Sequence, residues 1–260
     1  MTKLTSTPTP QQTQRSDRIT ALYIGLTYNQ LEENKWLPMM RISWDDDGNY
    51  YHSYTQAFSN NYYGLEGHVL NPERGYTKLL KEKKIIEILN NRTPRRPDSM
   101  VEYDLLGIED LKGDAIAYLA RSGGEVQSDR YDVFPEIAPN SNEVYDFYFP
   151  ISGICELYSN RDLTAKIMFD LLPEGRKLEL RHTVNNTEIY HLGTKIGYCP
   201  KYVSYLLKTL DNNYKYQLSV ERVNKLDPRY VFRAIANLKI KSHQNLFNNP
   251  LFETIHPMPV

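Results

Sequence analysis

The stretch of sequence that decides the fold covers residues 175–210 and reads GRKLELRHTVNNTEIYHLGTKIGYCPKYVSYLLKTL. Its first half has the residue types of half-buried strands, which we expect at 177–183 and at about 188–196, with an asparagine-rich turn between them. Pro200 then marks the start of a helix over 201–210, because apolar residues return there at helical spacing. Short strands and a single helix therefore characterise this part of the chain.

Strand patterns continue on both sides of this stretch, at 165–169, 214–223 and 231–240. Between Ile19 and Phe58, apolar and polar residues alternate, which indicates strands and a hairpin that turns at Asp47-Gly48. The acidic run that ends at Asp47 is interpreted as turn chemistry, since an EF-hand needs spaced carboxylates and a closing glutamate. The other expected elements are strands at 131–134 and 144–149, and helices at 76–91, at 114–120 and from an Asp98-Ser99 cap to Leu106.

These patterns predict an α+β protein with four parts. Residues 1–18 are rich in Thr, Gln and Pro and are expected to be a disordered lead-in. Residues 19–142 form an N-terminal α+β domain with a mixed β-sheet and short helices. Residues 143–242 form a second domain of short strands with one helix, and residues 243–260 an irregular tail.

Composition narrows the classes of function. The 260 residues include 21 tyrosines, a residue that favours half-buried strands and also offers rings on which bases stack. The net charge of −1 gives no indication of a protein that coats DNA non-specifically, so any nucleic-acid site must be local. We find no signal peptide and no apolar run of the roughly 20 residues that cross a bilayer, so we expect a cytoplasmic protein without membrane contact.

Three motifs in the deciding stretch carry a resemblance to a known family. They are Gly175-Arg-Lys-Leu-Glu-Leu, Asn185-Asn186-Thr-Glu188 and Lys195-Ile-Gly-Tyr-Cys-Pro200, and in this order they resemble the HIRAN domain. Earlier segments are similar to the N-terminal part of bacterial proteins that end in such a domain. These segments lie at 36–41, 54–55, 95–98, 120–124 and 132–135.

The resemblance implies a small OB-like β-barrel with one helix over residues 143–242. It also implies DNA binding, which in helicase-linked members captures the free 3′ end of a single strand. Three residues depart from the family pattern: Cys155-Glu156 stands where the family often has a basic residue and then an aromatic residue or His, and Glu188 replaces an aspartate. Stacking on aromatic rings and cations that hold phosphates explain such binding physically. The candidate nucleic-acid-binding residues are Asn185, Glu188, Tyr190, Lys195, Tyr198, Lys201 and Tyr202.

No catalytic residue, metal or cofactor is predicted. Cys199 is interpreted as a small core residue, although it precedes a helix start. His182 and His191 lack the third and fourth ligands of a metal site and are interpreted as surface residues of a hairpin. The expected partner is single-stranded or 3′-ended DNA. The alternative is a protein partner in a bacterial defence or mobile-element complex, and a nuclease using Glu102 and Asp114 is least favoured.

Overall fold

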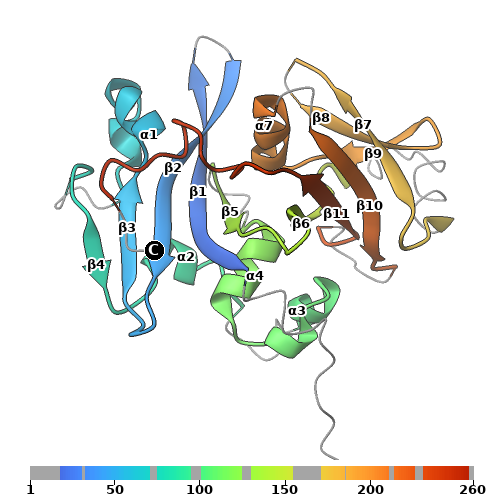
Figure 1. The fold of residues 1–260 in the computed structure, drawn as a ribbon, viewed down its shortest axis with the longest axis horizontal. Coiled ribbons are helices and arrows are strands. Elements are labelled where there is room, and N and C mark those ends of the chain that lie inside the picture. Colours follow the sequence, from blue (N-terminus) through green and yellow to red (C-terminus); the bar gives the residue numbers. More distant parts are fainter. Residues whose placement is uncertain are drawn as a thin grey trace, which may run out of the picture.

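The described residues contain eleven strands in two antiparallel sheets that lie side by side, with helices packed against them (Figure 1). The computed structural model describes residues 18–257 apart from 31–32, 71–74, 95–100, 125–129, 155–170, 185, 211–213 and 226–230. The predictions for residues 1–17, for the strand at 165–169 and for the Asp98-Ser99 cap lie outside these residues. No helix in the described part of the chain is both long enough and apolar enough to cross a membrane.

The first sheet has the strand order β4-β3-β2-β1-β5, and all of its pairs are antiparallel. The prediction of a mixed sheet is therefore wrong, because β1, β2 and β3 follow one another as hairpins and hairpins join antiparallel neighbours. The predicted turn is confirmed: Gly48 has φ +73°, and Asp45 accepts a hydrogen bond from the Asn49 amide at 2.8 Å. The strands are β1 (Ile19–Gln30), β2 (Glu33–Trp44), β3 (Tyr50–Tyr54), β4 (Leu80–Glu82) and β5 (Tyr131–Ile137).

Short helices cover the first sheet. The predicted helix at 114–120 is confirmed, with Asp114 as N-cap and Gly123 in the left-handed conformation as C-cap. The predicted helix at 76–91 is wrong. Leu80 is buried and pairs with the edge of β3, whereas Leu79 is exposed, so the leucines do not share one helix face. The helices here are α1 (Gln56–Asn60), α2 (Glu87–Asn90), α3 (Val101–Leu105) and α4 (Ala115–Ser122), with 3-10 turns at Tyr62–Gly64, Glu66–His68 and Glu109–Leu111.

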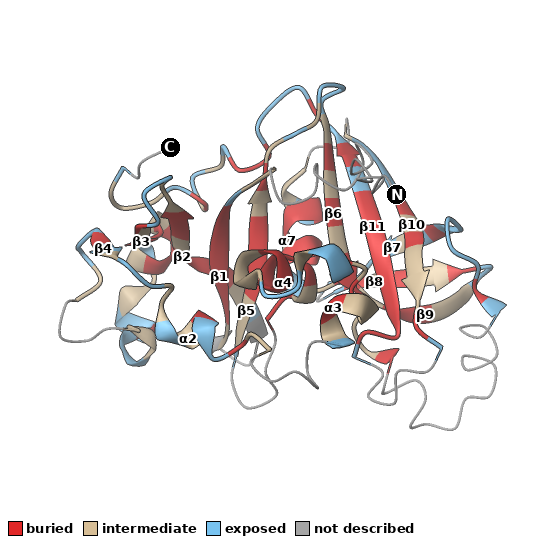
Figure 2. Ribbon diagram, turned by 90° about the horizontal axis from the view of Figure 1, so that it is seen from below, coloured by how far each residue is buried: buried red, intermediate tan, exposed pale blue. Residues whose placement is uncertain are grey.

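β1 is buried on both of its faces (Figure 2). Leu22 and Ile24 point into an apolar cluster shared with α1, α3 and α4. Tyr23 points the other way, into a cluster shared with the second sheet and the helix after Pro200. The alternating sequence of β1 therefore belongs to a strand that is buried on both faces, not to one with a solvent-exposed face.

The second sheet has the order β6-β11-β10-β7-β8-β9 and is also antiparallel throughout. One bridge joins Ser152, just after β6, to Tyr198 at the end of β9, with N–O distances of 3.0 and 2.9 Å. Within the described residues, no continuous ladder closes the sheet into a barrel. The strands are β6 (Val144–Pro150), β7 (Lys177–His182), β8 (Thr187–His191), β9 (Thr194–Tyr198), β10 (Lys215–Val223) and β11 (Ala234–Lys241).

The single strand expected at 188–196 is instead the hairpin of β8 and β9. Leu192 and Gly193 have φ values of 47° and 79°, as a two-residue type I′ turn requires. Leucine is rare at such a position, and this explains why the turn is not visible in the sequence. The helix predicted after Pro200 is confirmed as α7 (Lys201–Thr209).

The C-terminal segment crosses from the second sheet to the first (Figure 1). Its backbone forms turns and one bridge, but Phe247 and Phe252 are buried beside Tyr23. The Tyr23 hydroxyl donates to the Phe252 carbonyl at 3.2 Å, and the Ile255 amide donates to the Tyr54 carbonyl at 2.9 Å. This segment is therefore a structural strap that closes one face of β1.

Candidate nucleic-acid interface

The strands β7, β8 and β9 bury one face and expose the other. Inward-facing Leu178, Ile189 and Ile196 belong to the core of the second sheet. Among the outward positions are Arg181, Glu188, Tyr190, Lys195 and Tyr198, and we call this set the β7–β9 face. The strand pairing brings its members together, since Glu188 lies opposite both Arg181 and Tyr198, and Tyr190 lies opposite Lys195. Glu179 lies on the same side, opposite Tyr190, and its carboxylate is 3.6 Å from Arg181.

An irregularity in the β8–β9 pairing puts Lys195 and Tyr198 on the same face. Residues three apart in a regular strand point to opposite faces. Here Ile189 pairs with Gly197 but Tyr190 pairs with Lys195, so β9 has one extra residue. Gly197 permits this arrangement, because a Cβ there would lie 2.4 Å from Ile151 Cγ2 and 2.6 Å from the Ser152 carbonyl oxygen.

Glu188 is the centre of the hydrogen bonding on this face. Its carboxylate accepts from the Tyr190 hydroxyl at 2.8 Å and from Lys195 Nζ at 3.3 Å. The hydrogen bond from Tyr190, followed by that from Lys195, lowers the pKa of Glu188 and keeps it ionised at neutral pH. Lys195 also donates to the Tyr198 hydroxyl at 3.0 Å, and this bond raises the pKa of the lysine.

Arg181 is the member of the face that the sequence analysis missed. Its guanidinium lies 3.9 Å from the centroid of the Tyr190 ring, and Lys195 Nζ lies 4.9 Å from that of Tyr198. The side chains of Arg181 and Lys195 are 52% and 32% exposed, so both cations reach solvent beside a tyrosine. The spacing in the sequence could have indicated this position. Arg181 is two residues after Glu179, so both occupy the polar positions of a strand in which apolar and polar residues alternate.

The other predicted site residues are not on this face. Asn185 lies outside the described residues. Lys201 is exposed but donates to Thr27 Oγ1 of the first sheet at 3.1 Å. Tyr202 is 3% exposed and stacks on Phe134 with 5.2 Å between ring centroids, so its assignment as a surface residue is wrong. The first turn of α7 faces the junction of the sheets, and burial raises the pKa of Tyr202.

The structure also places the cysteine and the two histidines that were considered for chemistry. Cys199 is buried, and desolvation raises the pKa of its thiol, which disfavours a nucleophilic thiolate. His182 pairs with Thr187, at the opposite end of β8 from His191, so the two imidazoles do not face each other. His191 is 6% exposed and is therefore not the surface residue that we expected. Among the described residues, no group of three or more His, Cys, Asp or Glu side chains is arranged to hold a metal.

Comparisons with protein-family models, with curated proteins and with solved structures find no match to this chain.

Proposed function

We propose that the protein binds single-stranded DNA, and in particular its 3′ end, through the β7–β9 face. The observation that carries this proposal is the arrangement of two half-buried tyrosines, each with a cation over its ring, on one open sheet surface. Aromatic rings stack on bases of any sequence, while nearby cations hold the phosphates between them. Arg181 with Tyr190 and Lys195 with Tyr198 would each supply one such pair.

The distribution of charge supports this assignment. Residues 143–242 contain 15 lysines and arginines against 11 aspartates and glutamates, a formal charge of +4. Residues 1–142 contain 16 against 20, a formal charge of −4. The overall charge of −1 therefore hides a polarity along the chain that would orient a polyanion toward the second sheet.

Glu188 explains why the proposed site should prefer a 3′ hydroxyl. Because it is ionised at neutral pH, its carboxylate can accept a hydrogen bond from a terminal hydroxyl and repels a terminal phosphate. Each oxygen of the carboxylate can accept a second hydrogen bond, so the nucleotide can bind beside the hydrogen bonds from Tyr190 and Lys195. A 3′-phosphate strand should therefore bind more weakly than the same strand with a 3′ hydroxyl.

The proposal includes an OB-like, HIRAN-type arrangement for residues 143–242. The bridge between Ser152 and Tyr198 supports it, because it brings the end of β6 against β9, the opposite edge of the same sheet. Tyr198 thereby lies where the two edges approach each other. In OB-folds, the exposed strands and adjoining loops bind single strands.

Fluorescence anisotropy with a labelled oligonucleotide tests the proposal. We expect binding that weakens with salt, and tighter binding to the 3′-hydroxyl form than to the 3′-phosphate form. Lys195→Gln should reduce the slope of log K against log salt by about 0.7, the value for one lost phosphate contact with a single strand. Tyr190→Ala should weaken binding by about tenfold, the order expected for one lost base stack.

Tyr216→Ala is the matched control, because Tyr216 is also a strand tyrosine, 44% exposed, but lies near the start of β10 away from this face. Its affinity should equal that of the unsubstituted protein. The proposal fails if the protein shows no binding at low salt, or if Tyr216→Ala and Tyr190→Ala weaken binding equally.

A protein partner is the second candidate, and it is favoured by the exposed apolar residues at the two hairpin turns beside this face. Val184 is 90% exposed and Leu192 is 69% exposed. Such residues recur at contact sites between proteins more than at DNA interfaces, which are polar and basic. Co-purification that is lost in a Val184→Ser, Leu192→Ser variant, with DNA binding unchanged, would support this candidate.

A further inference from the structure

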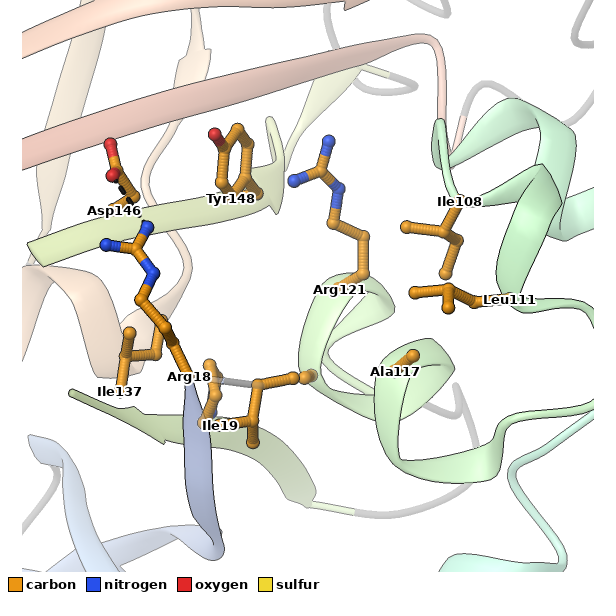
Figure 3. Close-up of a pocket in the computed structure, with 11 residues that line it drawn as sticks. Arg18, Ile19, Ile108, Leu111, Ala117, Arg121, Ile137, Asp146 and Tyr148 are labelled. Atoms are coloured by element: carbon orange, nitrogen blue, oxygen red, sulfur yellow. Dashed lines mark hydrogen bonds and ion pairs between the residues drawn. The ribbon is translucent and has the colours of Figure 1, made fainter. Parts of the chain in front are cut away.

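A small cavity lies where the two sheets meet, apart from the β7–β9 face (Figure 3). It has a volume of about 50 Å³, enough for one or two water molecules, and it is open to solvent on one side, so a larger molecule can enter it only in part. Ile19 and Ile137 line it from the first sheet, Ala117 lines it from α4, and Asp146 and Tyr148 line it from β6. Its walls are largely apolar, but two arginines also reach it.

Arg18 enters the cavity just before β1. Its Nη2 donates to Asp146 Oδ2 at 2.9 Å, while its Nη1 is buried and has no hydrogen-bond partner among the described residues. The other oxygen of Asp146, Oδ1, is also buried without a hydrogen bond from the described residues, and lies 3.9 Å from Lys239 Nζ. One donor and one acceptor therefore lie unsatisfied beside the same ion pair, which is costly unless a ligand or water satisfies them.

Arg121 enters from the last turn of α4 and is 5% exposed. Its guanidinium lies 3.8 Å from the centroid of the Tyr148 ring, and its Nε donates to the Leu106 carbonyl at 2.9 Å. These contacts hold the guanidinium at the wall of the cavity (Figure 3). The charged lining is two arginines and one aspartate. Arg121 Nη2 also lies 3.7 Å from Glu221 Oε1, and with the ion-pair partners Glu221 and Lys239 counted the net charge is +1.

We propose that this cavity binds a small monocarboxylate with an apolar body and a hydroxyl group next to the carboxylate. The carboxylate matches the net positive lining and accepts from Arg18 Nη1. The hydroxyl donates to Asp146 Oδ1, so the ligand satisfies both buried atoms. The apolar body packs against Ile19, Ala117 and the other aliphatic residues of the wall.

Methyl NMR can test the proposal, because three isoleucines line the cavity: Ile19, Ile108 and Ile137. With isoleucine δ1 methyl groups labelled, the probe is 2-hydroxy-3-methylbutanoate. We expect saturable shifts of these three signals, while those of Ile189 and Ile196, in the core beneath the β7–β9 face, stay in place. 3-Methylbutanoate, which lacks the hydroxyl, should bind more weakly, and 2-hydroxy-3-methylbutanamide, which lacks the charge, more weakly still.

Arg18→Met should weaken binding of 2-hydroxy-3-methylbutanoate at least about tenfold, the range for losing a hydrogen bond to a charged group. Lys215→Met is the matched control, since Lys215 is an exposed lysine of β10 and is not among the residues that line the cavity, and the affinity of this variant should be unchanged. Unshifted Ile189 and Ile196 signals would show that each variant is folded.

Three results would overturn the proposal. The first is the absence of saturable shifts with the hydroxy acid, and the second is an amide that binds as tightly as the acid. The third is an Arg18→Met variant that binds like the unsubstituted protein. Equal affinities for the two acids would overturn the contact between the hydroxyl and Asp146. None of these measurements involves DNA, so they are independent of the function proposed for the β7–β9 face.

Discussion

β1 and β8 are both inner strands of antiparallel sheets, but they differ in what covers them. β1 has an apolar cluster on each face, with Leu22 and Ile24 on one side and Tyr23 on the other. β8 buries Ile189 on its inner face and presents Glu188 and Tyr190 on the outer one. Burial on both faces leaves a strand no surface for a ligand, whereas one open face leaves side chains that can exchange partners.

The polar groups near β1 and β8 differ in the same way as the strands. Trp36 Nε1 donates to the Asp132 carboxylate at 3.0 Å across Gly25 of β1, where a Cβ would lie 2.6 Å from the indole. That hydrogen bond is part-buried, and the indole also packs against Phe134 and Tyr205, so it contributes to the stability of the sheet. The Glu188–Lys195 pair lies at the surface, where ion pairs contribute at most about 1 kcal/mol and are easily exchanged.

A tyrosine-to-alanine substitution in each strand is expected to show the largest difference between β1 and β8. Tyr23 is 2% exposed and stacks on Phe134 with 5.1 Å between centroids, so Tyr23→Ala should lower the free energy of unfolding by about 3–5 kcal/mol. Tyr190→Ala removes a half-exposed ring and should change it by about 0.5 kcal/mol. Urea denaturation measures both values. Equal losses would show that β8 is as much a part of the scaffold as β1.

A substitution in the strap that closes the Tyr23 face of β1 should cause the next largest loss of stability. Phe252 is 3% exposed and contacts both Tyr23 and Phe134 edge to face. Phe252→Ala should cost about 3 kcal/mol of stability, because it leaves a cavity between the strap and the sheet. The neighbouring Glu253→Ala, at an exposed position whose backbone carbonyl accepts from Gln56, is the control and should have little effect. A neutral Phe252→Ala would mean that β1 does not need the strap.

Much of this architecture could be predicted from the sequence, and the exceptions have physical reasons. The alternation in β1 and the helix at 114–120 are local signals, and the structure confirms them. The strap is different: a segment rich in Asn and Pro has no period, so its burial depends on Phe247 and Phe252 meeting rings from residues distant in the chain. Long-range contacts of this kind have no local pattern.

The candidate site was predictable only in part for a similar reason. Glu188, Tyr190, Lys195 and Tyr198 were predicted together and share one face. Tyr202 was grouped with them by its position in the sequence, but the orientation of α7 turns it toward Phe134. The extra residue in β9 is also a tertiary effect, since Gly197 is needed only because Ile151 and Ser152 approach it closely.

The close approach of Ile151 and Ser152 to Gly197 leads to the third prediction, which concerns packing beneath β8 and β9. Gly197→Ala places a methyl group against Ile151 and Ser152, and the resulting overpacking should cost about 1–3 kcal/mol. Gly64→Ala is the control, because a Cβ there meets no atom within 4 Å. If both variants unfold at the same urea concentration, the contact between β9 and the segment after β6 is not tight. The inner face of β8 would then not be tightly packed.

The smallest expected effect is a difference in acid response between two carboxylates. Hydrogen bonds from the Asn49 side chain and amide lower the pKa of Asp45, in the β2–β3 turn, from 3.8 to about 2. A depressed folded pKa contributes stability above the unfolded pKa and loses it as pH falls through the folded value. The contribution of Asp45 should therefore fade between about pH 4 and pH 2, and Asp45→Asn should flatten this part of the stability profile.

The pKa of Glu188 is also lowered, but its hydrogen bonds lie on the open face, so we expect its protonation to change DNA binding. Acid should reduce the preference for a 3′ hydroxyl over a 3′ phosphate, because a neutral carboxyl no longer repels the phosphate. Glu188→Gln should abolish that preference at neutral pH and leave the urea midpoint nearly unchanged. A large loss of stability in Glu188→Gln, with the preference intact, would place Glu188 with the enclosed polar groups near β1 and remove it from the proposed site.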